Sequence, residues 1–140
     1  MTSGYLLLAD IDNFKNVNDI YGHQSGDNVL CEVAERLSNN VRHFDILARF
    51  GGEEFIIFVP TKSEEAAVLF SQRLIRVIAE NSFFISSYNI NLKITMSLGA
   101  VYVEDINSNF DTAYKLADES LYMAKKQGKN RMCLSQKDLS

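Results

Sequence analysis

The spacing of apolar residues divides the first third of the chain into a strand, a polar stretch and a helix. Residues 5–11 form a short apolar block that runs into acidic residues, which predicts a buried strand. Residues 12–26 are polar and rich in Asn, Asp and Gly, so we expect a loop with a short helical piece. Apolar residues then recur every four positions from Val29 to Val41, which predicts a helix that begins near 25–27.

The middle of the chain predicts a hairpin followed by a second helix. Two short apolar runs, 46–50 and 55–59, flank Gly51 and Gly52, a glycine pair that favours a tight turn between two strands. Residues 61–64 match a capping box, in which a hydroxyl and a glutamate three residues later pair with free amides at a helix start. We therefore expect the second helix to begin there.

The last third predicts strands and one long helix. Residues 92–103 are strand-like, and 84–88 is expected to pair with them. A helix is predicted from 110 to 127, before Gly128, a residue favoured just past a helix end, and 130–134 adds an edge strand. The element order favours an α+β fold with a mainly antiparallel central sheet flanked by helices, rather than a doubly wound parallel sheet.

The bulk composition is typical of one globular domain. The 140 residues are 46% hydrophobic and 23% charged, and no apolar run approaches the roughly 18 residues needed to cross a membrane. We therefore expect a cytoplasmic domain without membrane contact. The formal net charge of −4 disfavours nonspecific binding to nucleic acid. Cys31 and Cys133 lie far apart without metal-ligand spacing, and we expect buried, reduced thiols.

Carboxylates gather at two predicted strand ends. Asp10 and Asp12 end the first strand, whereas Glu53 and Glu54 lie at the tip of the hairpin. If the two strands are neighbours, these ends could share a hard cation such as Mg²⁺, with other positions left for phosphate and water. The alternative is a solvated rim of charges beside a simple turn. A triphosphate clamp around such a metal would use three lysines: Lys15, Lys125 and Lys129, the last two one helical turn apart.

Six sequence blocks carry these candidates and extend over nearly the whole chain: Asp10–Lys15, Asn18–Asp19, Gly22–Asp27, Arg49–Phe55, Ser97–Gly99 and Leu121–Arg131. In order and spacing they resemble the GGDEF domain of diguanylate cyclases. The resemblance implies a palm-like core, shared in outline with nucleotidyl cyclases and polymerases. It also implies condensation of two GTP into cyclic di-GMP with release of pyrophosphate.

The resemblance implies a metal-dependent site on the two strand ends. Asp10, the Ile11 backbone carbonyl and Glu53 would hold Mg²⁺, for which Mn²⁺ could substitute. Glu54 would lie beside the metals and help to deprotonate the attacking 3′-hydroxyl. The chemistry agrees, because two cations stabilise both the attacking and the leaving oxygens of a phosphoryl displacement.

The resemblance also implies how the phosphates of GTP are held. Backbone N–H groups from Asn13 through Phe14 to Lys15 would cradle the terminal phosphates, as amides at a helix start do, while the ring of Phe14 serves packing. Lys15, Lys125 and Lys129 would neutralise them. The family usually has arginine at position 129; lysine keeps the charge but loses the bidentate fork.

Asn18 and Asp27 match the family's guanine-reading pair. A carboxylate accepts from both N1–H and the exocyclic amine of guanine, and adenine offers neither group there. A cyclase that makes a mixed or adenine-containing dinucleotide is therefore disfavoured. The alternative role for Asp27 is a helix N-cap.

Arg42 and Asp45 form an Arg-x-x-Asp pattern whose Asp lies six positions ahead of Gly51. This matches the family's inhibitory product site, in which a guanidinium binds guanine or phosphate and the aspartate accepts from the guanine edge. Arg73, on the next predicted helix, matches a second arginine that the family often supplies. The alternative for Arg42 and Asp45 is a surface ion pair.

One part of the family pattern is missing. The family carries a helix with an Asp-x-Leu-Thr-type segment before the first strand, whereas this chain starts almost directly at that strand. We therefore expect residues 1–140 to be one GGDEF domain, without its usual N-terminal helix, from a longer protein with an N-terminal sensor or regulatory domain. A membrane anchor in that longer protein is compatible with a cytoplasmic location of this domain.

The product joins two identical halves, so catalysis is expected to need a homodimer. The alternative to an active cyclase is a non-catalytic module that binds GTP or cyclic di-GMP. The intact carboxylates Asp10, Glu53 and Glu54 disfavour it.

Overall fold

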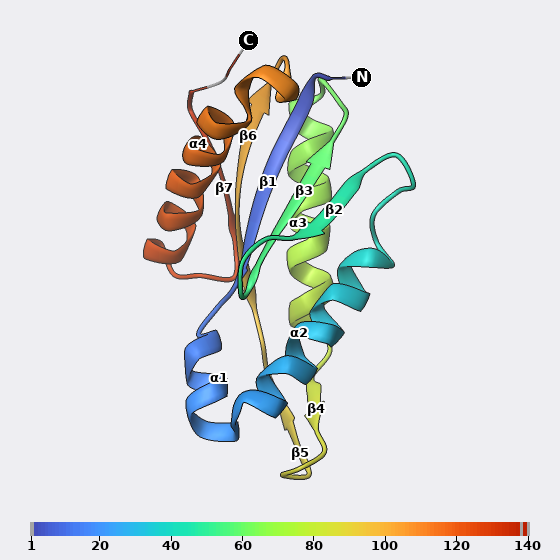
Figure 1. Cartoon of the computed structure of the whole chain (residues 1–140), viewed down its shortest axis with the longest axis vertical. Helices are drawn as coiled ribbons and strands as arrows, with labels where there is room; N and C mark the ends of the chain where they lie inside the picture. The colour runs from blue at the N-terminus through green and yellow to red at the C-terminus, as the bar shows by residue number, and fades with distance from the viewer. Residues whose placement is uncertain (1, 138, 140) are drawn as a thin grey trace.

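The computed structural model of the chain describes residues 2–137 and 139. Strands and helices follow one another as Figure 1 shows. Their bounds are β1 Gly4–Ile11, α1 Phe14–Tyr21, α2 His23–Ser38, β2 Ile46–Arg49, β3 Glu54–Val59, α3 Glu64–Glu80, β4 Phe83–Ile85, β5 Ile90–Leu92, β6 Met96–Val103, α4 Ile106–Lys126 and β7 Met132–Leu134.

The main sheet has the strand order β2-β3-β1-β6-β7, so β1 lies at its centre. β1 pairs antiparallel with both β3 and β6, and β2 pairs antiparallel with β3. Within the described residues, β7 is the strand that runs parallel to its neighbour, β6. The predictions of an α+β fold, a mainly antiparallel central sheet and a C-terminal edge strand are confirmed.

Side chains on β1 alternate between two apolar layers, as a strand buried on both faces requires. Leu6 and Leu8 pack with residues of β3 and α4 on one face. Leu7 and Ala9 pack with α2 and α3 on the other face. The sheet therefore lies between helices, with α4 on one side and α3 on the other (Figure 1). α1, the start of α2 and the tip of the β2–β3 hairpin lie near the end of the sheet where β1 stops.

α4 lies unusually close to β6 because Gly99 has no side chain. A Cβ atom there would collide with the Ala117 carbonyl oxygen and the Leu121 amide nitrogen of α4. Helix backbone atoms cannot move aside as a flexible side chain can, so a glycine is needed for this approach. The close packing holds α4, and the residues it carries, at a defined height above the centre of the sheet.

One predicted helix start and one predicted helix cap were wrong. α2 begins at His23 rather than near 25–27, directly after Gly22, whose positive φ of 88° separates it from α1. α3 begins after Ser63, whose hydroxyl accepts from the Ala66 amide at 3.1 Å, so the capping box at Thr61 does not form. The Thr61 amide still donates to the Val59 carbonyl, and this turn after β3 moves the cap from Thr61 to Ser63.

Other predicted bounds were wrong in the C-terminal half. The stretch 92–103 divides into the end of β5 and the separate strand β6, and β5 pairs with β4 in a small second sheet. α4 begins at Ile106 with Asp105 as its cap, four residues earlier than predicted, and Asn109 has non-helical dihedral angles.

The predicted β2–β3 hairpin is confirmed, although its first strand ends at Arg49 rather than at residue 50, whereas the prediction of buried thiols was wrong. Residues 50–53 separate β2 from β3, and the loop is closed by the Phe50 amide donating to the Glu54 carbonyl at 2.8 Å. Cys31 is exposed and Cys133 is half-buried, both as free thiols. None of the helices in residues 2–137 is both long and apolar enough to cross a membrane.

Candidate active site

Sheet pairing brings the predicted carboxylate ends together. Asp10 on β1 lies directly opposite Glu54 on β3, and opposite Ser97 on β6. Directly paired residues present their side chains on the same face, here the face that α4 covers. Glu53 comes from the adjoining loop, close enough to Asp10 to interact with it electrostatically. The condition under which the two strand ends could share a cation, that their strands are neighbours, is met.

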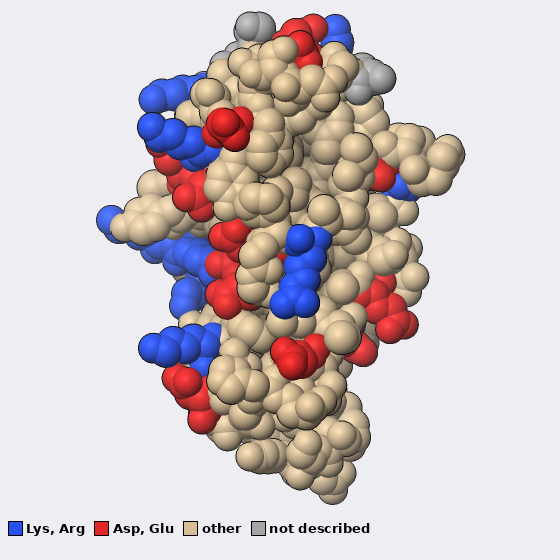
Figure 2. Space-filling model, viewed as in Figure 1, with Lys and Arg blue, Asp and Glu red and all other residues tan. Residues whose placement is uncertain are grey.

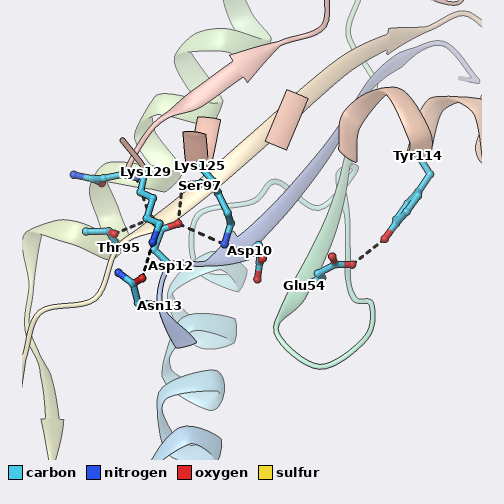
Figure 3. Close-up of polar contacts among 10 residues, drawn as sticks. Asp10, Asp12, Asn13, Glu54, Thr95, Ser97, Tyr114, Lys125 and Lys129 are labelled. Carbon is cyan, nitrogen blue, oxygen red and sulfur yellow. Dashed lines mark hydrogen bonds and ion pairs between the residues drawn. The ribbon is translucent and has the colours of Figure 1, made fainter. Parts of the chain in front are cut away.

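The carboxylates at this strand end hold more negative charge than the nearby cation balances. Burial raises the pKa of Glu53 above its ordinary value, and the neighbouring Asp10 carboxylate raises it further, whereas Lys125 opposes the rise. The Lys125 Nζ atom lies 2.9 Å from Asp10 Oδ2 (Figure 3). Asp10 Oδ1 is buried and has no hydrogen-bond partner.

An unpartnered buried carboxylate oxygen beside a second carboxylate fits a hard divalent cation. Within the described part of the chain, no group of three His, Cys, Asp or Glu side chains is arranged to hold a metal ion. The candidate ligands are therefore two side chains, Asp10 and Glu53, and the Ile11 carbonyl. Such a partial set leaves positions for phosphate oxygens and water, as Mg²⁺ sites for nucleotides commonly do.

Asp12 does not join this cluster. Its Oδ2 atom accepts from the Thr95 hydroxyl at 2.7 Å and from the Asn130 amide at 3.0 Å, and its Oδ1 atom accepts from the Ser97 hydroxyl at 2.7 Å. The residue is buried, and Lys125 is 3.7 Å away. These donors already occupy both oxygens (Figure 3), so the expectation that Asp12 shares a cation with Asp10 is corrected: Asp12 ties β1 to β6 and to the turn before β7.

The turn from β1 into α1 offers amides to an anion. Asn13 has a left-handed conformation, with φ of 57°, and its carbonyl accepts from Asn16 at 3.0 Å. The amides of Phe14 and Lys15 precede these first helical bonds, so no helical acceptor is available to them. The ring of Phe14 is buried, in agreement with a packing role, and the Lys15 side chain is exposed.

Lys129 reaches the same turn from the other end of the chain. It lies beyond α4, which ends at Lys126, and its φ of 66° is left-handed, so it is not one helical turn from Lys125 on the same helix as expected. Its Nζ atom nevertheless lies 2.6 Å from the Asn13 side-chain oxygen (Figure 3). The turn and a lysine are therefore brought together by the tertiary structure.

The candidate guanine-reading residues lie on two successive helices, α1 and α2. Asn18 lies on α1, and its side chain occupies the space that a Cβ atom at Gly26 would need. Asp27 follows on α2 and is exposed. Because α2 begins at His23, Asp27 lies inside the helix and is not its N-cap.

Sequence reasoning missed Tyr114. Its hydroxyl on α4 donates to Glu54 Oε1 at 2.8 Å, 60 residues away in sequence (Figure 3). Burial raises the pKa of Tyr114 to about 12, and the bond to Glu54 contributes, so the phenol remains a donor at neutral pH. The one signal in the sequence is the spacing between Tyr114 and Lys125, close to three helical turns, which places both on one face of α4.

The Arg-x-x-Asp residues lie at the opposite end of β3 from Glu54. Asp45 Oδ2 accepts from the Arg42 backbone amide at 2.8 Å, and no ion pair joins the two side chains as they are described. Arg73 on α3 donates to the Asn40 carbonyl at 2.6 Å and lies over the Phe70 ring at 5.4 Å.

Two polar atoms in this second cluster are buried without a partner: Asp45 Oδ1 and Arg73 Nε. A cavity of about 190 Å³ is lined by residues that include Arg42, Asp45 and Phe70, and the Arg73 guanidinium lies over the ring of Phe70. Polar atoms left in this way are costly unless a ligand or water pairs with them. The structure brings all three predicted residues into one neighbourhood, separate from the carboxylates.

Acidic and basic side chains alternate on the face seen in Figure 2. Red Asp and Glu atoms gather near the middle of the face, with blue Lys and Arg atoms on both sides. A separate cavity of about 340 Å³, lined partly by Asn16 and Ile20, opens on α1. These residues lie on nearly the opposite helix face from Asn18, so this cavity is not the one that the guanine-reading pair would line.

Comparison with known proteins identifies one family. The family model described as "Diguanylate cyclase, GGDEF domain" matches residues 1–131. Diguanylate cyclase A of Treponema denticola is 39% identical over 137 residues, which are 96% of this chain and 36% of that protein. The chain therefore spans about a third of the length of this curated relative, and it spans 21% of another.

Solved structures agree in fold. The GGDEF domain of DgcB from Caulobacter crescentus, in complex with c-di-GMP, superposes with a TM-score of 0.89 at 29% identity, covering 97% of this chain and 80% of that one. The active GGEEF domain of a diguanylate cyclase from Vibrio cholerae gives a TM-score of 0.83 at 32% identity, covering 97% and 85%.

Proposed function

The chain belongs to the GGDEF family of diguanylate cyclase domains, and on this premise we propose that it condenses two GTP into cyclic di-GMP. The 3′-hydroxyl of each GTP attacks the α-phosphorus of the other. Two phosphodiester bonds form, and two pyrophosphates leave. The observation that carries this proposal is the unpartnered, buried Oδ1 atom of Asp10 beside Glu53 and Glu54 at one strand end.

The residues at the strand ends would have different roles in catalysis. Asp10, Glu53 and the Ile11 carbonyl would hold Mg²⁺, which when bound supplies positive charge for the phosphate oxygens. Glu54 accepts the proton of the attacking 3′-hydroxyl, a general-base role that needs a carboxylate within hydrogen-bond reach. Lys125, now paired with Asp10, would become free to pair with a phosphate once a cation takes over that carboxylate.

GTP would be held at the start of α1 and between α1 and α2. Amides of Phe14 and Lys15 bind the terminal phosphates, with Lys15 and Lys129 supplying charge. Asn18 and Asp27 read the guanine edge, and ATP is rejected because Asp27 would lose both of its donors. Half-burial of Asn18 against Gly26 supports this, since it fixes the side chain that meets the base.

Catalysis would need two chains and a second site for product. One domain offers one nucleotide site, so two domains related by a two-fold axis present their GTP molecules to each other. Arg42, Asp45 and Arg73 would bind cyclic di-GMP and inhibit from a distance. The unpartnered Asp45 Oδ1 and Arg73 Nε atoms support a ligand there. A sensor or regulatory domain, where one is joined to this domain, would control how the two domains meet.

The test is incubation with GTP and Mg²⁺ followed by mass analysis of the product. Protein should be fused to a dimerising coiled coil and assayed over a range of concentrations. Asp10→Asn and Glu53→Gln should each abolish turnover, because the cation charge is then poorly balanced. The matched control Glu119→Gln changes an exposed carboxylate on α4 and should retain activity. Bound GTP without product from the dimerised protein would instead identify a non-catalytic binding module.

The product site has its own test. Arg42→Ala removes a charge-assisted contact of about 1.5–3 kcal/mol, so affinity for cyclic di-GMP should fall roughly 10- to 150-fold. Turnover should survive while inhibition fades. Arg76→Ala, an exposed arginine on α3, is the control. Unchanged product affinity in Arg42→Ala would exclude this site.

A further inference from the structure

α4 places one side chain on each of two neighbouring carboxylates. Lys125 contacts Asp10 at 2.9 Å, and Tyr114 donates to Glu54 at 2.8 Å (Figure 3). Asp10 and Glu54 are direct partners across β1 and β3. The two α4 residues are close to three helical turns apart and therefore share a face. The close packing at Gly99 keeps that face at a constant height above the carboxylates.

Tyr114 is itself held in place. Its ring packs against Phe50 of the hairpin loop at 5.3 Å between centroids, and against Phe110, one turn earlier on α4, at 6.2 Å. A tyrosine clamped on two sides has little freedom to move its hydroxyl. The Glu54 carboxylate is then turned toward α4 and away from Asp10 (Figure 3).

From this geometry we propose that Tyr114 is a positioning residue for Glu54: its hydroxyl binds one carboxylate oxygen and leaves the other to face the 3′-hydroxyl of GTP. The inference rests on the proposed function, because it assigns Tyr114 a role in that reaction through Glu54. Tyr114 itself touches no reacting atom.

The physical reason is rotational freedom. A glutamate has three side-chain torsions, and an unrestrained carboxylate next to Asp10 and Glu53 would be pushed toward solvent by like charge. A hydrogen bond from a rigid phenol removes most of that freedom before substrate arrives. A base positioned in advance loses less rate to misorientation than one that must be ordered during the reaction.

The catalytic test uses Tyr114→Phe, which keeps the ring contacts and removes only the hydroxyl. We expect kcat to fall about 10-fold, part of the 10²- to 10⁴-fold that a general base contributes. Affinity for 3′-deoxy-GTP, which lacks the attacking hydroxyl and cannot react, should stay within twofold by calorimetry in Mg²⁺. Tyr122→Phe, an exposed tyrosine on the same helix, is the matched control and should leave kcat and affinity unchanged.

A second test needs no nucleotide. In thermal unfolding of the free protein, Tyr114→Phe should lower Tm in the unmodified chain but not in a chain that already carries Glu54→Ala. Such non-additivity is the mark of two groups in direct contact. An equal fall in Tm in both backgrounds would show that the hydroxyl does not bind Glu54 in solution.

The outcomes distinguish the positioning role of Tyr114 from the proposed cyclase function. Unchanged kcat in Tyr114→Phe overturns the positioning role, as does a loss of 3′-deoxy-GTP affinity equal to the loss of kcat, because Tyr114 would then serve the nucleotide pocket as a whole. No product from the dimerised, unmodified chain overturns the proposed function and the catalytic part of this inference together, while the unfolding test still decides whether the contact exists.

Discussion

Replacing Asp12 with alanine removes the acceptor that three donors share. This buried carboxylate accepts hydrogen bonds from the Thr95 hydroxyl, the Ser97 hydroxyl and the Asn130 amide. They come from the start of β6 and from the turn before β7, so the loss should loosen the junction between β1 and both segments. We expect Asp12→Ala to destabilise the fold rather than to remove a metal ligand.

The magnitude follows from the surroundings of each donor. Leaving a buried donor unpaired costs about 1–3 kcal/mol. Ser97 is fully buried, whereas water can reach the donors of Thr95 and Asn130 more easily, so the total should be about 4 kcal/mol. Asp12→Asn should cost only about 1–2 kcal/mol, because one oxygen remains for Thr95 and Asn130 and the Ser97 hydroxyl can turn to accept from the new amide.

Urea unfolding followed by circular dichroism measures how much each variant lowers the free energy of unfolding. With an m-value of about 2 kcal/mol per molar urea, the midpoint should fall by about 2 M in Asp12→Ala and by about 0.5–1 M in Asp12→Asn. Asp111→Ala, an exposed aspartate on α4, is the control and should leave the midpoint unchanged.

Mg²⁺-dependent binding of nucleotide tests the alternative that Asp12 is a metal ligand. Asp12→Asn should still bind 3′-deoxy-GTP in the presence of Mg²⁺, whereas Asp10→Asn should not. If Asp12→Asn keeps its urea midpoint but loses Mg²⁺-dependent binding, Asp12 is a metal ligand and the reasoning from its hydrogen bonds is refuted.

Four further predictions concern single positions. Gly99→Ala should lower the free energy of unfolding by about 1–3 kcal/mol, because its methyl group meets the α4 backbone; an unchanged urea midpoint would contradict this packing. Gly26→Ala should weaken 3′-deoxy-GTP binding by displacing the Asn18 side chain, which calorimetry would detect as a lower affinity at little cost in Tm. Lys129→Arg should tighten nucleotide binding about two- to fivefold by restoring a bidentate fork, and a weaker affinity would argue against phosphate contact. The raised pKa of Tyr114, about 12 against 10.0, means that the folded chain keeps a proton which the unfolded chain releases, so stability is present below pH 10 and declines as pH rises toward 12; the fall in urea midpoint between pH 9 and pH 11 should be smaller in Tyr114→Phe.

Local pattern was sufficient for most elements of the fold. Apolar periodicity identified β1, the bodies of α2, α3 and α4, the β2–β3 pair and the edge strand β7. It failed at boundaries, where a turn bond such as Thr61 to Val59 or the early cap of Asp105 outweighed the local motif. A helix starts at the polar residue whose side chain accepts from a free amide of the first turn. The conformation of the preceding turn decides which of several polar residues this is.

The sequence also predicted part of the candidate site and left another part open. The blocks around Asp10, Glu53 and Asp27 were recognisable in the sequence because each is a short run of residues with constant spacing. That Asp10 meets Glu54 followed once β1 and β3 were taken as neighbours, a pairing that the sequence left open.

Only the tertiary structure gave the physical reason why one aspartate is free. Local pattern does not distinguish Asp10 from Asp12, and the family resemblance alone implied Asp10 as the ligand. In the structure Asp12 is occupied by donors 83, 85 and 118 residues away, whereas Asp10 keeps a buried oxygen without a partner. The contact between Tyr114 and Glu54, 60 residues apart, arose in the same way. A side chain's chemistry depends on the neighbours that compete for it, and those neighbours come from distant segments that no local period encodes.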